Sequence, residues 1–463
     1  MGEKLLAQRL IGLLRETNAR TSATALALLD WARDQSDWLW PERKFAEAAD
    51  VPAEGAEALS WERLPAFAAV IDTGGGAEPP MFASVDAAAE ILELDAFELE
   101  VLRMAAALER LPRLSSLRTR LAHYGEDLTA LLGQLAGAEP ATAASRVRRS
   151  GPVALGLLVA DSDPIGGGLE LSLDWRFARV LDEGLTQPDM LIDALAGVRQ
   201  PASLRPSDFA EHREPFRLLV RLLVGALARK AEGVNVLIYG PPGTGKTEFA
   251  RTLAEAACAS LFAVGEMDED GEEPTRYQRL HALKRAQRLL ARRGDSILLF
   301  DEMEDLFAEA SIAAGGGRRS GSKIFVNRLL ESNRVPTIWT SNAIDEVDPA
   351  HLRRMSYILR MGHPNVEARA RIVTRAAEAE GVAEAGPGLV ALLPQEEESA
   401  SVARVALRAA ALAGGGAADA EAVGRSLLLG MRGGRCFHLL KGGRSISTFA
   451  RPIVRWRSWW SRS

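Results

Sequence analysis

The fold of this chain is decided by Val236-Leu237-Ile238-Tyr239-Gly240-Pro241-Pro242-Gly243-Thr244-Gly245-Lys246-Thr247, an apolar run that ends in a glycine-rich loop. The loop fits the pattern G-x-x-x-x-G-K-[ST], and a helical pattern follows it directly. Its glycines let the backbone turn tightly and present N–H groups to an anion. The N-terminus of the following helix adds free N–H groups and a partial positive charge there. The stretch therefore predicts a strand, a phosphate-binding loop and a helix, in that order.

The side chains of this loop have separate expected roles. Lys246 is expected to reach the β- and γ-phosphates of a nucleotide, and Thr247 is expected to hold Mg²⁺. A glycine- and proline-rich surface turn is the alternative, but the required strand and helix flank the loop. The predicted nucleotide-binding residues are Gly240, Pro241, Pro242, Gly243, Thr244, Gly245, Lys246 and Thr247.

The composition of the chain is that of a soluble globular protein. It has 463 residues, of which 47% are hydrophobic and 25% charged, and this length indicates about two to four domains. The net charge of −6 gives no overall attraction to nucleic acid or to an anionic membrane. The two cysteines, Cys258 and Cys436, argue against a disulfide framework and a cysteine-based zinc site. No apolar run reaches the ~18 residues of a membrane span, and the N-terminus does not resemble a signal peptide, so a cytoplasmic location is expected.

Residues 1–139 show a mainly helical pattern and are predicted to form an N-terminal helical domain. Asp95 and Glu98 fit a capping box at the start of one of its helices. Early tryptophans are more typical of packing between helices than of an interaction surface. They are Trp31, Trp38, Trp40 and Trp61.

Residues 140–205 are predicted to form a small α+β subdomain. Two strand-like runs, 153–159 and 169–173, surround a turn and indicate a hairpin. Helices followed by a hairpin suggest a winged-helix-like arrangement, and the nearby arginines then leave contact with nucleic acid open. A structural module with a solvated basic face is favoured, because acidic residues reduce the positive field. Residues 206–233 are predicted to be a linker helix that ends at Gly233.

Residues 234–364 alternate strands and helices, as in a parallel α/β sheet. The apolar strand 296–300 runs directly into Asp301 and Glu302, which is the hhhhDE form of a Walker B motif. Asp301 is expected to bind magnesium, and Glu302 is expected to orient and polarise an attacking water. Asn342 follows another buried strand and is expected to hydrogen-bond that water. Glu304 is expected to be a solvated residue at a helix start.

Four motifs in this order resemble the AAA+ ATPases over roughly residues 234–425: Gly240–Thr247, Ile297–Glu302, Thr340-Ser341-Asn342 and Asp348–Arg354. The resemblance implies a P-loop NTPase parallel sheet, the AAA+ large subdomain, with a small α-helical lid over 365–430. It also implies a hydrolase that uses ATP and Mg²⁺ and couples turnover to remodelling of a protein or macromolecular complex.

The resemblance implies an arginine finger at Arg353 or Arg354 that reaches the γ-phosphate bound to a neighbouring subunit. It therefore implies a ring or another oligomer. The usual arginine–proline–glycine–arginine pattern is replaced here by Arg353-Arg354-Met355-Ser356. In the lid, either Arg404 or Arg408 fits the place of a further nucleotide-sensing arginine, and a plain surface arginine fits equally well.

A second departure from the family concerns the segment 263–274, where many members carry an aromatic loop that grips a polypeptide. Here the segment is acidic and has no aromatic residue. This predicts a module that hydrolyses ATP without pulling a substrate itself. A protein substrate or adaptor is expected to bind the N-terminal region. Two other functions stay open, a DNA-associated ATPase or loader and a nucleotide-gated scaffold with low turnover.

Residues 431–463 form a basic tail that contains three tryptophans, and no acidic residue follows Glu421. Three interpretations stay open. The tail binds nucleic acid or an anionic membrane, it is a disordered end, or it is read out of frame. In the last case the chain would be a truncated relative of bacterial proteins that continue into a second ATPase module.

Overall fold

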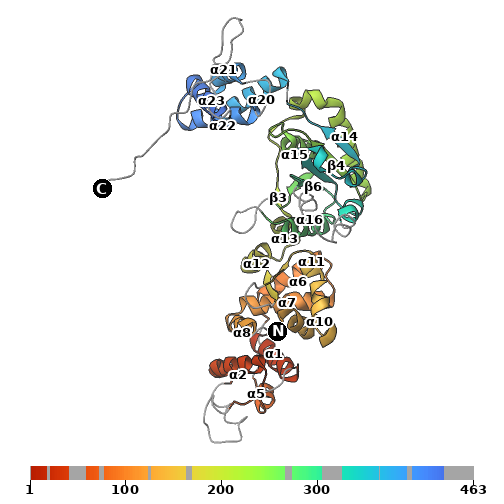
Figure 1. Cartoon of the computed structure of the whole chain (residues 1–463), viewed down its shortest axis with the longest axis vertical. Coiled ribbons are helices and arrows are strands. Elements are labelled where there is room, and N and C mark those ends of the chain that lie inside the picture. The colour runs from red at the N-terminus through yellow and green to blue at the C-terminus, as the bar shows by residue number, and fades with distance from the viewer. Residues whose placement is uncertain are drawn as a thin grey trace, which may run out of the picture. The chain divides into compact units, whose positions relative to one another are not determined.

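The computed structural model describes residues 2–17, 21–40, 59–71, 78–123, 127–162, 169–265, 274–304, 326–363, 365–393 and 399–431. The chain divides into two compact units, Met1–Ala368 and Arg369–Ser463 (Figure 1). The basic tail beyond residue 431 and most of the acidic segment 263–274 lie outside the described residues. The finer division into six segments stays a prediction.

A six-stranded sheet lies at the centre of the nucleotide-binding region, with the order β3-β5-β6-β7-β4-β8. Strands β4 to β8 pair in parallel, and β3 pairs antiparallel with β5. The strands are β3 (Val198–Arg199), β4 (Asn235–Tyr239), β5 (Ser260–Ala263), β6 (Ser296–Phe300), β7 (Thr337–Ser341) and β8 (Tyr357–Arg360). The predicted parallel α/β fold is confirmed.

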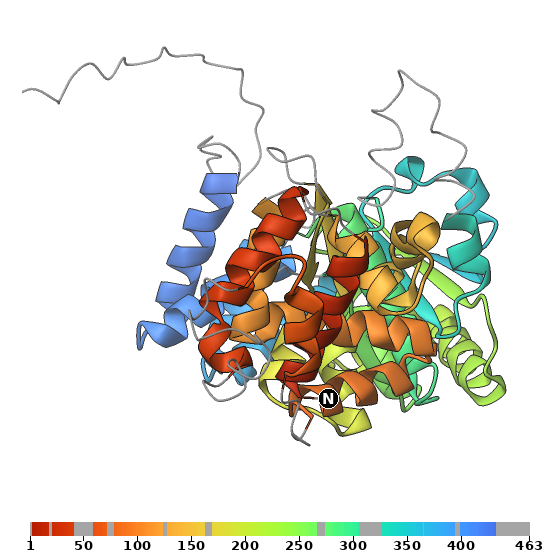
Figure 2. The same ribbon diagram turned by 90° about the horizontal axis from the view of Figure 1, so that it is seen from below.

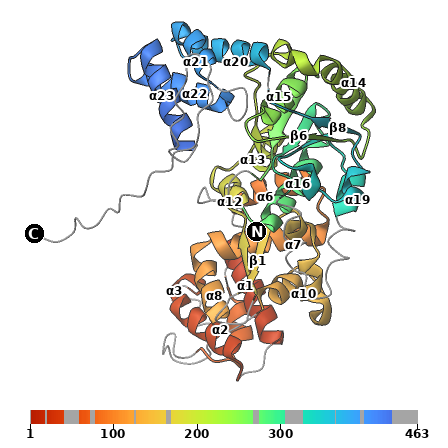
Figure 3. The same cartoon turned by 45° about the horizontal axis from the view of Figure 1, so that its top comes forward.

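The central strands are buried on both faces, as their continuous apolar sequences predict. Side chains of β6 alternate between the two faces. Ile297 and Leu299 pack in the core that contains α14 (Arg213–Arg229) and α15 (Lys246–Ala256). Leu298 and Phe300 pack in the core that contains α16 (Arg276–Leu290). The helices α15 and α16 therefore cover opposite faces of the sheet (Figure 3).

Two segments outside the predicted module 234–364 contribute to this region. β3 adds an edge strand, although the sequence assigns its residues to the preceding subdomain. α14 packs its apolar face against α15, so residues 206–233 form a 3₁₀ helix (Pro206–His212) and a core helix instead of a simple linker. A two-residue strand is too short to give a sequence pattern, which is why β3 is missing from the prediction.

The N-terminal region is mainly helical, as predicted, and its helices pack side by side (Figure 2). The capping box of Asp95 and Glu98 is present at the start of α7, with both hydrogen bonds formed. Trp31, Trp40 and Trp61 are buried in the core and Trp38 packs half-buried against it, which confirms their packing role. The helices are α1 (Glu3–Thr17), α2 (Ala23–Asp34), α3 (Ser36–Leu39), α5 (Leu64–Ala69), α6 (Met81–Ile91), α7 (Ala96–Arg110), α8 (Pro112–His123), α9 (Leu128–Leu135), α10 (Pro140–Arg148) and α11 (Gly151–Ala154).

The predicted hairpin is present as β1 (Leu158–Ser162) and β2 (Leu169–Leu173), which pair antiparallel. The sequence predicts the first strand over 153–159, but it begins only at Leu158, because the helix α11 occupies Gly151–Ala154. It is followed by α12 (Trp175–Asp182) and α13 (Pro188–Ala196). The arginines before the hairpin make internal contacts. The guanidinium of Arg146 lies 3.8 Å from the ring centroid of Phe97, and Arg148 pairs with Asp127 at 3.2 Å.

Arg285 on α16 joins the sheet region to the N-terminal region. Its side chain is only 3% exposed. It donates to the carbonyl of Leu195 at 3.0 Å and to that of Gly156 at 2.8 Å, and it lies 3.4 Å from the carboxylate of Asp174. Burial lowers the pKa of Arg285, and Asp174 opposes this shift. A buried guanidinium with these partners holds α16, α13 and the residues before β1 together.

We expect Arg285→Met to destabilise the first unit by about 3–5 kcal/mol, because it leaves Asp174 and three backbone carbonyls without their buried partner. The midpoint of urea unfolding, followed by tryptophan fluorescence, measures this loss. Arg221→Met on the exposed face of α14 is the control and should change stability by less than about 0.5 kcal/mol. Equal midpoints for the two variants would contradict the assigned role of Arg285.

The second unit is a small group of helices around its own apolar core, which includes Val373, Leu389, Leu407 and Ala420. Its elements are α20 (Val366–Ala379), η4 (Ala383–Ala385), α21 (Gly386–Leu392), α22 (Ser399–Leu412) and α23 (Ala417–Met431). Arg404 and Arg408 are both exposed on α22. Among the helices that the structure describes, none combines the length and apolarity needed to cross a membrane.

Candidate functional site

The glycine-rich loop connects β4 to α15 at the carboxyl end of the parallel sheet. Gly240, Gly243 and Gly245 have φ values of +151°, +73° and +88°. A Cβ atom at Gly240 would lie 1.9 Å from the carbonyl oxygen of Met361, so that position accepts only glycine. Between Gly240 and Gly245 lie Pro241, Pro242 and Thr244, whose hydroxyl donates to the Pro241 carbonyl at 2.9 Å. The helix α15 starts at Lys246, directly after the loop.

Lys246 is buried, with 8% of its surface exposed, and its ammonium lies inside the loop. Nζ donates to the carbonyl oxygens of Gly240 and Pro241 at 2.8 and 3.1 Å and to Oδ1 of Asn342 at 2.9 Å. Burial lowers the pKa of Lys246, and the carboxylates of Asp301, Glu304 and Glu302 oppose the shift. The structure thus brings together a loop lysine and an asparagine that are far apart in the sequence.

Thr247 and Asp301 form a pair of oxygen groups beside the loop. The Thr247 hydroxyl donates to Oδ2 of Asp301 at 3.0 Å. Hydroxyl and carboxylate oxygens suit Mg²⁺, which takes one or two protein oxygens and completes its shell with phosphates and waters. The described residues contain no group of three or more His, Cys, Asp or Glu side chains placed to hold a metal alone. The donor set therefore fits a magnesium ion that arrives with a nucleotide.

Thr340 on β7 connects Asp301 to Glu302. Its hydroxyl donates to Oδ1 of Asp301 and accepts from the backbone N–H of Glu302, the latter at 3.1 Å. Glu302 has a φ of +54°, a left-handed conformation that non-glycine residues rarely adopt. Such strain persists only where neighbouring groups hold it in place. The conformation of Glu302 is therefore set by the adjacent strand.

Glu304 is half-buried, and the prediction of a solvated helix start is wrong. Its Oε1 accepts a hydrogen bond from the backbone N–H of Asn342 at 2.9 Å. Its other carboxylate oxygen is buried and has no hydrogen-bond partner among the described residues. The carboxylate is held inward because it accepts from the backbone where β7 ends. Glu304 thus positions Asn342, whose side chain accepts from Lys246.

Arg279 is a site residue that the sequence does not reveal. It lies on α16, is 7% exposed, and donates to the backbone carbonyl of Asp301. Its guanidinium lies 4.4 Å from the ring centroid of Phe300. Nothing distinguishes Arg279 from the other basic residues of its helix in the sequence. Its contact depends on the packing of α16 against β6.

The two candidate arginine fingers follow the short helix α19 (Pro349–Leu352). Arg354 pairs with Glu331 at 2.6 Å and donates to the carbonyl of Ala350 at 2.6 Å. Arg353 is exposed, and within the described residues its side chain makes no hydrogen bond or ion pair. The structure therefore separates two neighbours that the sequence leaves equivalent.

Comparison with known proteins gives one family match. Residues 236–363 match the family model described as ATPase family associated with various cellular activities (AAA). A solved structure of the FIGL-1 AAA domain in complex with ADP is 19% identical with a TM-score of 0.34. The aligned region covers 46% of this chain and 81% of the FIGL-1 chain.

Curated relatives match over parts of their length. ATPase family gene 2 protein homolog B of Rattus norvegicus is 33% identical over 193 residues, which span 38% of this chain and 25% of that protein. Protein CdcH of Halobacterium salinarum is 29% identical over 151 residues, or 30% and 19% of the two chains. The 26S proteasome regulatory subunit 8 homolog of Schizosaccharomyces pombe is 30% identical over 152 residues, or 30% and 36%. The aligned part is thus well under half of each of these relatives.

Proposed function

Because residues 236–363 belong to the AAA ATPase family, we propose that this chain binds ATP with Mg²⁺, hydrolyses it, and uses the turnover to remodel a protein or a macromolecular complex. The observation that carries this proposal is one connected set of contacts. Lys246 reaches Asn342, Thr247 reaches Asp301, and Thr340 joins Asp301 to Glu302. These groups supply phosphate binding, metal binding and activation of water in one place.

The proposed hydrolysis uses each group for a different task. The loop N–H groups and Lys246 bind the phosphates, and Mg²⁺, held by Thr247 and Asp301, would neutralise charge on the β- and γ-phosphates. Glu302 orients a water for in-line attack and accepts its proton. Asn342 donates to the γ-phosphate or to that water. In this structure the ammonium of Lys246 donates to Oδ1 of Asn342. A bound phosphate would therefore compete with Asn342 for the Lys246 ammonium.

Self-association is part of the proposal. Arg354 is held by Glu331 and Ala350 of its own chain, whereas Arg353 is exposed and is therefore the better candidate for the finger. A guanidinium from a neighbouring subunit would stabilise the charge that develops on the transferred phosphoryl group. One subunit thus supplies half of each hydrolytic site, which implies a ring or another oligomer.

The remodelled partner is proposed to bind the N-terminal region, because that region packs directly on α16. α16 also contacts the backbone of Asp301 through Arg279. A change at the phosphate site can therefore reach the N-terminal helices through one helix. The cytoplasm remains the proposed compartment, since two cysteines suit a reducing environment.

A Lys246→Ala variant is expected to bind ATP about 10- to 100-fold more weakly, because it loses a charge-assisted contact to the phosphates. Titration with a fluorescent ATP analogue measures the affinity. Lys230→Ala, at the exposed end of α14, is the matched control and should bind as the wild type does. Unchanged affinity in Lys246→Ala would rule out the loop as the nucleotide site.

A further inference from the structure

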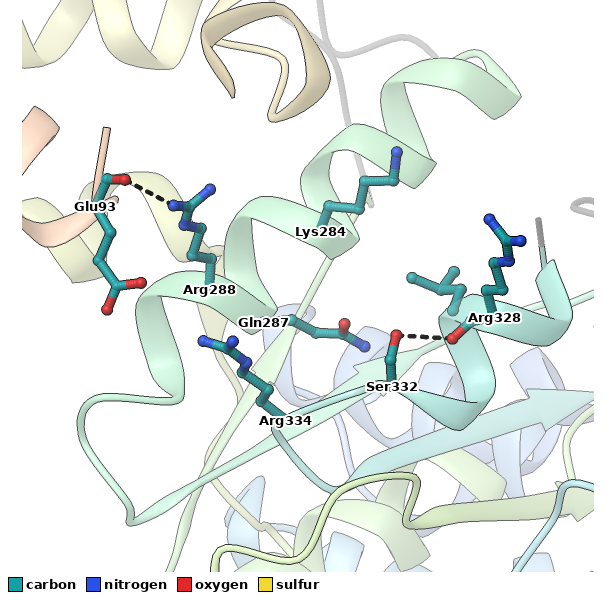
Figure 4. Close-up of a pocket in the computed structure, with 8 residues that line it drawn as sticks. Glu93, Lys284, Gln287, Arg288, Arg328, Ser332 and Arg334 are labelled. Carbon is teal, nitrogen blue, oxygen red and sulfur yellow. Dashed lines mark hydrogen bonds between the residues drawn. The ribbon is translucent and has the colours of Figure 1, made fainter. Parts of the chain in front are cut away.

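A concave site lies at the other end of the sheet from the phosphate-binding loop. It is a pocket of about 580 Å³ lined by α16, by residues 328–334 and by Glu93 (Figure 4). Arg334 precedes the amino end of β7, whereas Asn342 follows its carboxyl end. The five residues of β7, at about 3.3 Å each, therefore separate this pocket from the candidate ATP site.

The lining of this pocket is strongly basic. Its cations come from two separate segments, α16 and residues 328–334, and are Lys284, Arg288, Arg328 and Arg334. Among the lining residues that the structure describes, Glu93 is the one carboxylate. Arg334 also lies 3.9 Å from Glu232, but these side chains are 59% and 61% exposed, so this pair neutralises little. Like charges gathered in a concave surface attract an anion.

Gln287 provides an independent sign of a ligand. It is 8% exposed, and its Nε2 is a buried donor with no hydrogen-bond partner among the described residues. In Figure 4 its carboxamide extends from α16 towards Ser332, on the lining of the pocket. Buried polar groups in proteins are nearly always hydrogen-bonded, so a lone donor at a pocket wall indicates an acceptor that binds there.

The wall of the pocket is fixed by its own contacts. Arg288 donates to the carbonyl of Glu93 at 2.8 Å, and Ser332 donates to the carbonyl of Arg328 at 2.7 Å. Lys284 is half-buried, and this burial lowers the pKa of its ammonium. Charges in such a partly desolvated site act more strongly on a ligand than charges in open solvent.

We propose that this pocket binds a small, multiply charged phosphate anion. Arg328, Arg334 and Lys284 would contact its oxygens, and Gln287 would donate to one of them. The volume lies in the range of small-molecule sites, about 300–1,000 Å³. Arginine forks match the geometry of phosphate oxygens. A site for an extended acidic peptide or a nucleic acid would need a long row of cations, whereas the cations here form a compact group.

Calorimetric titration with sodium tripolyphosphate tests the proposal. All proteins carry Lys246→Ala, which removes the main phosphate contact of the ATP site. Arg328→Gln/Arg334→Gln is expected to weaken binding at least about tenfold, since two charged contacts are lost. Both arginines are exposed, so this variant should fold normally. Arg221→Gln/Arg229→Gln on α14 makes the same change in charge elsewhere and should stay within about twofold of the parent.

Two further arms define the ligand. Orthophosphate should bind more weakly than tripolyphosphate, because it carries less negative charge. ATP should bind through the same residues if the pocket recognises a chain of linked phosphates. Gln287→Leu should also weaken tripolyphosphate binding while the melting temperature stays close to that of the parent. The proposal is overturned if tripolyphosphate does not bind the Lys246→Ala protein, or if both double variants lose affinity equally. Tighter binding of a glutamate-rich peptide or of single-stranded DNA by the same residues would also overturn it.

Discussion

A Glu302→Gln variant is expected to bind ATP with unchanged affinity and to hydrolyse it about 10²- to 10⁴-fold more slowly, because it loses the proposed base. Glutamine keeps the size of the side chain but cannot accept the proton of the attacking water. The backbone of Glu302 is held by the hydroxyl of Thr340, so the substitution should leave the local conformation intact. Phosphate release under saturating ATP measures the rate, and a fluorescent analogue measures the affinity.

The matched control for this prediction is Glu255→Gln, at an exposed position on α15. It removes the same charge and should hydrolyse ATP at the rate of the wild type. If Glu302→Gln also kept the full rate, Glu302 would have no catalytic role. The chain would then fit a nucleotide-gated scaffold with low turnover better than an ATP-driven remodelling enzyme.

Replacing Arg353 by alanine is expected to lower the rate of hydrolysis by about 10³-fold or more, the size of effect that arginine fingers have elsewhere. The side chain of Arg353 is exposed and makes no hydrogen bond or ion pair within the described part of the chain, so its loss should not change stability. Arg354→Ala removes the contacts to Glu331 and Ala350 and should lower the melting temperature. Rate and melting temperature therefore separate a finger from a structural arginine.

A mixing experiment tests whether the finger acts between subunits. Lys246→Ala and Arg353→Ala proteins should each be nearly inactive, but a mixture should regain activity. In the mixed assembly, an intact loop on one subunit meets an intact Arg353 on the next. The rate per subunit should also rise with protein concentration. No recovery on mixing, together with a full rate in Arg353→Ala alone, would exclude the shared site.

The phosphate-binding loop and the residues Asp301 and Glu302 could be placed from the sequence, because each follows an apolar strand directly along the chain. A residue that directly follows a strand in the sequence lies at the end of that strand, whichever strands pair with it. Thr340 and Glu304 gained their roles only from strand pairing. β6 and β7 pair Phe300 with Trp339, and this register brings Thr340 beside Asp301. No local pattern specifies that register.

The role of Arg279 could not be predicted for a related reason. Its partner is a backbone carbonyl, which every residue carries and which leaves no mark on the sequence. The same holds for Arg285, whose partners include the carbonyls of Leu195 and Gly156. Arginines that bind backbone groups across a packed interface look like ordinary surface cations until the two surfaces are placed together.

The edge strand β3 has a consequence for how this chain can be divided. A fragment that begins at residue 206 would keep every residue of the candidate ATP site but would lose β3 and α13. β5 would then end the sheet with unpaired N–H and C=O groups, which recruit strands from other molecules. Such a fragment is expected to aggregate through this edge, so a loss of activity in it would not test whether the N-terminal helices bind a substrate. The shortest fragment that is expected to fold alone therefore begins before β3, well ahead of the glycine-rich loop.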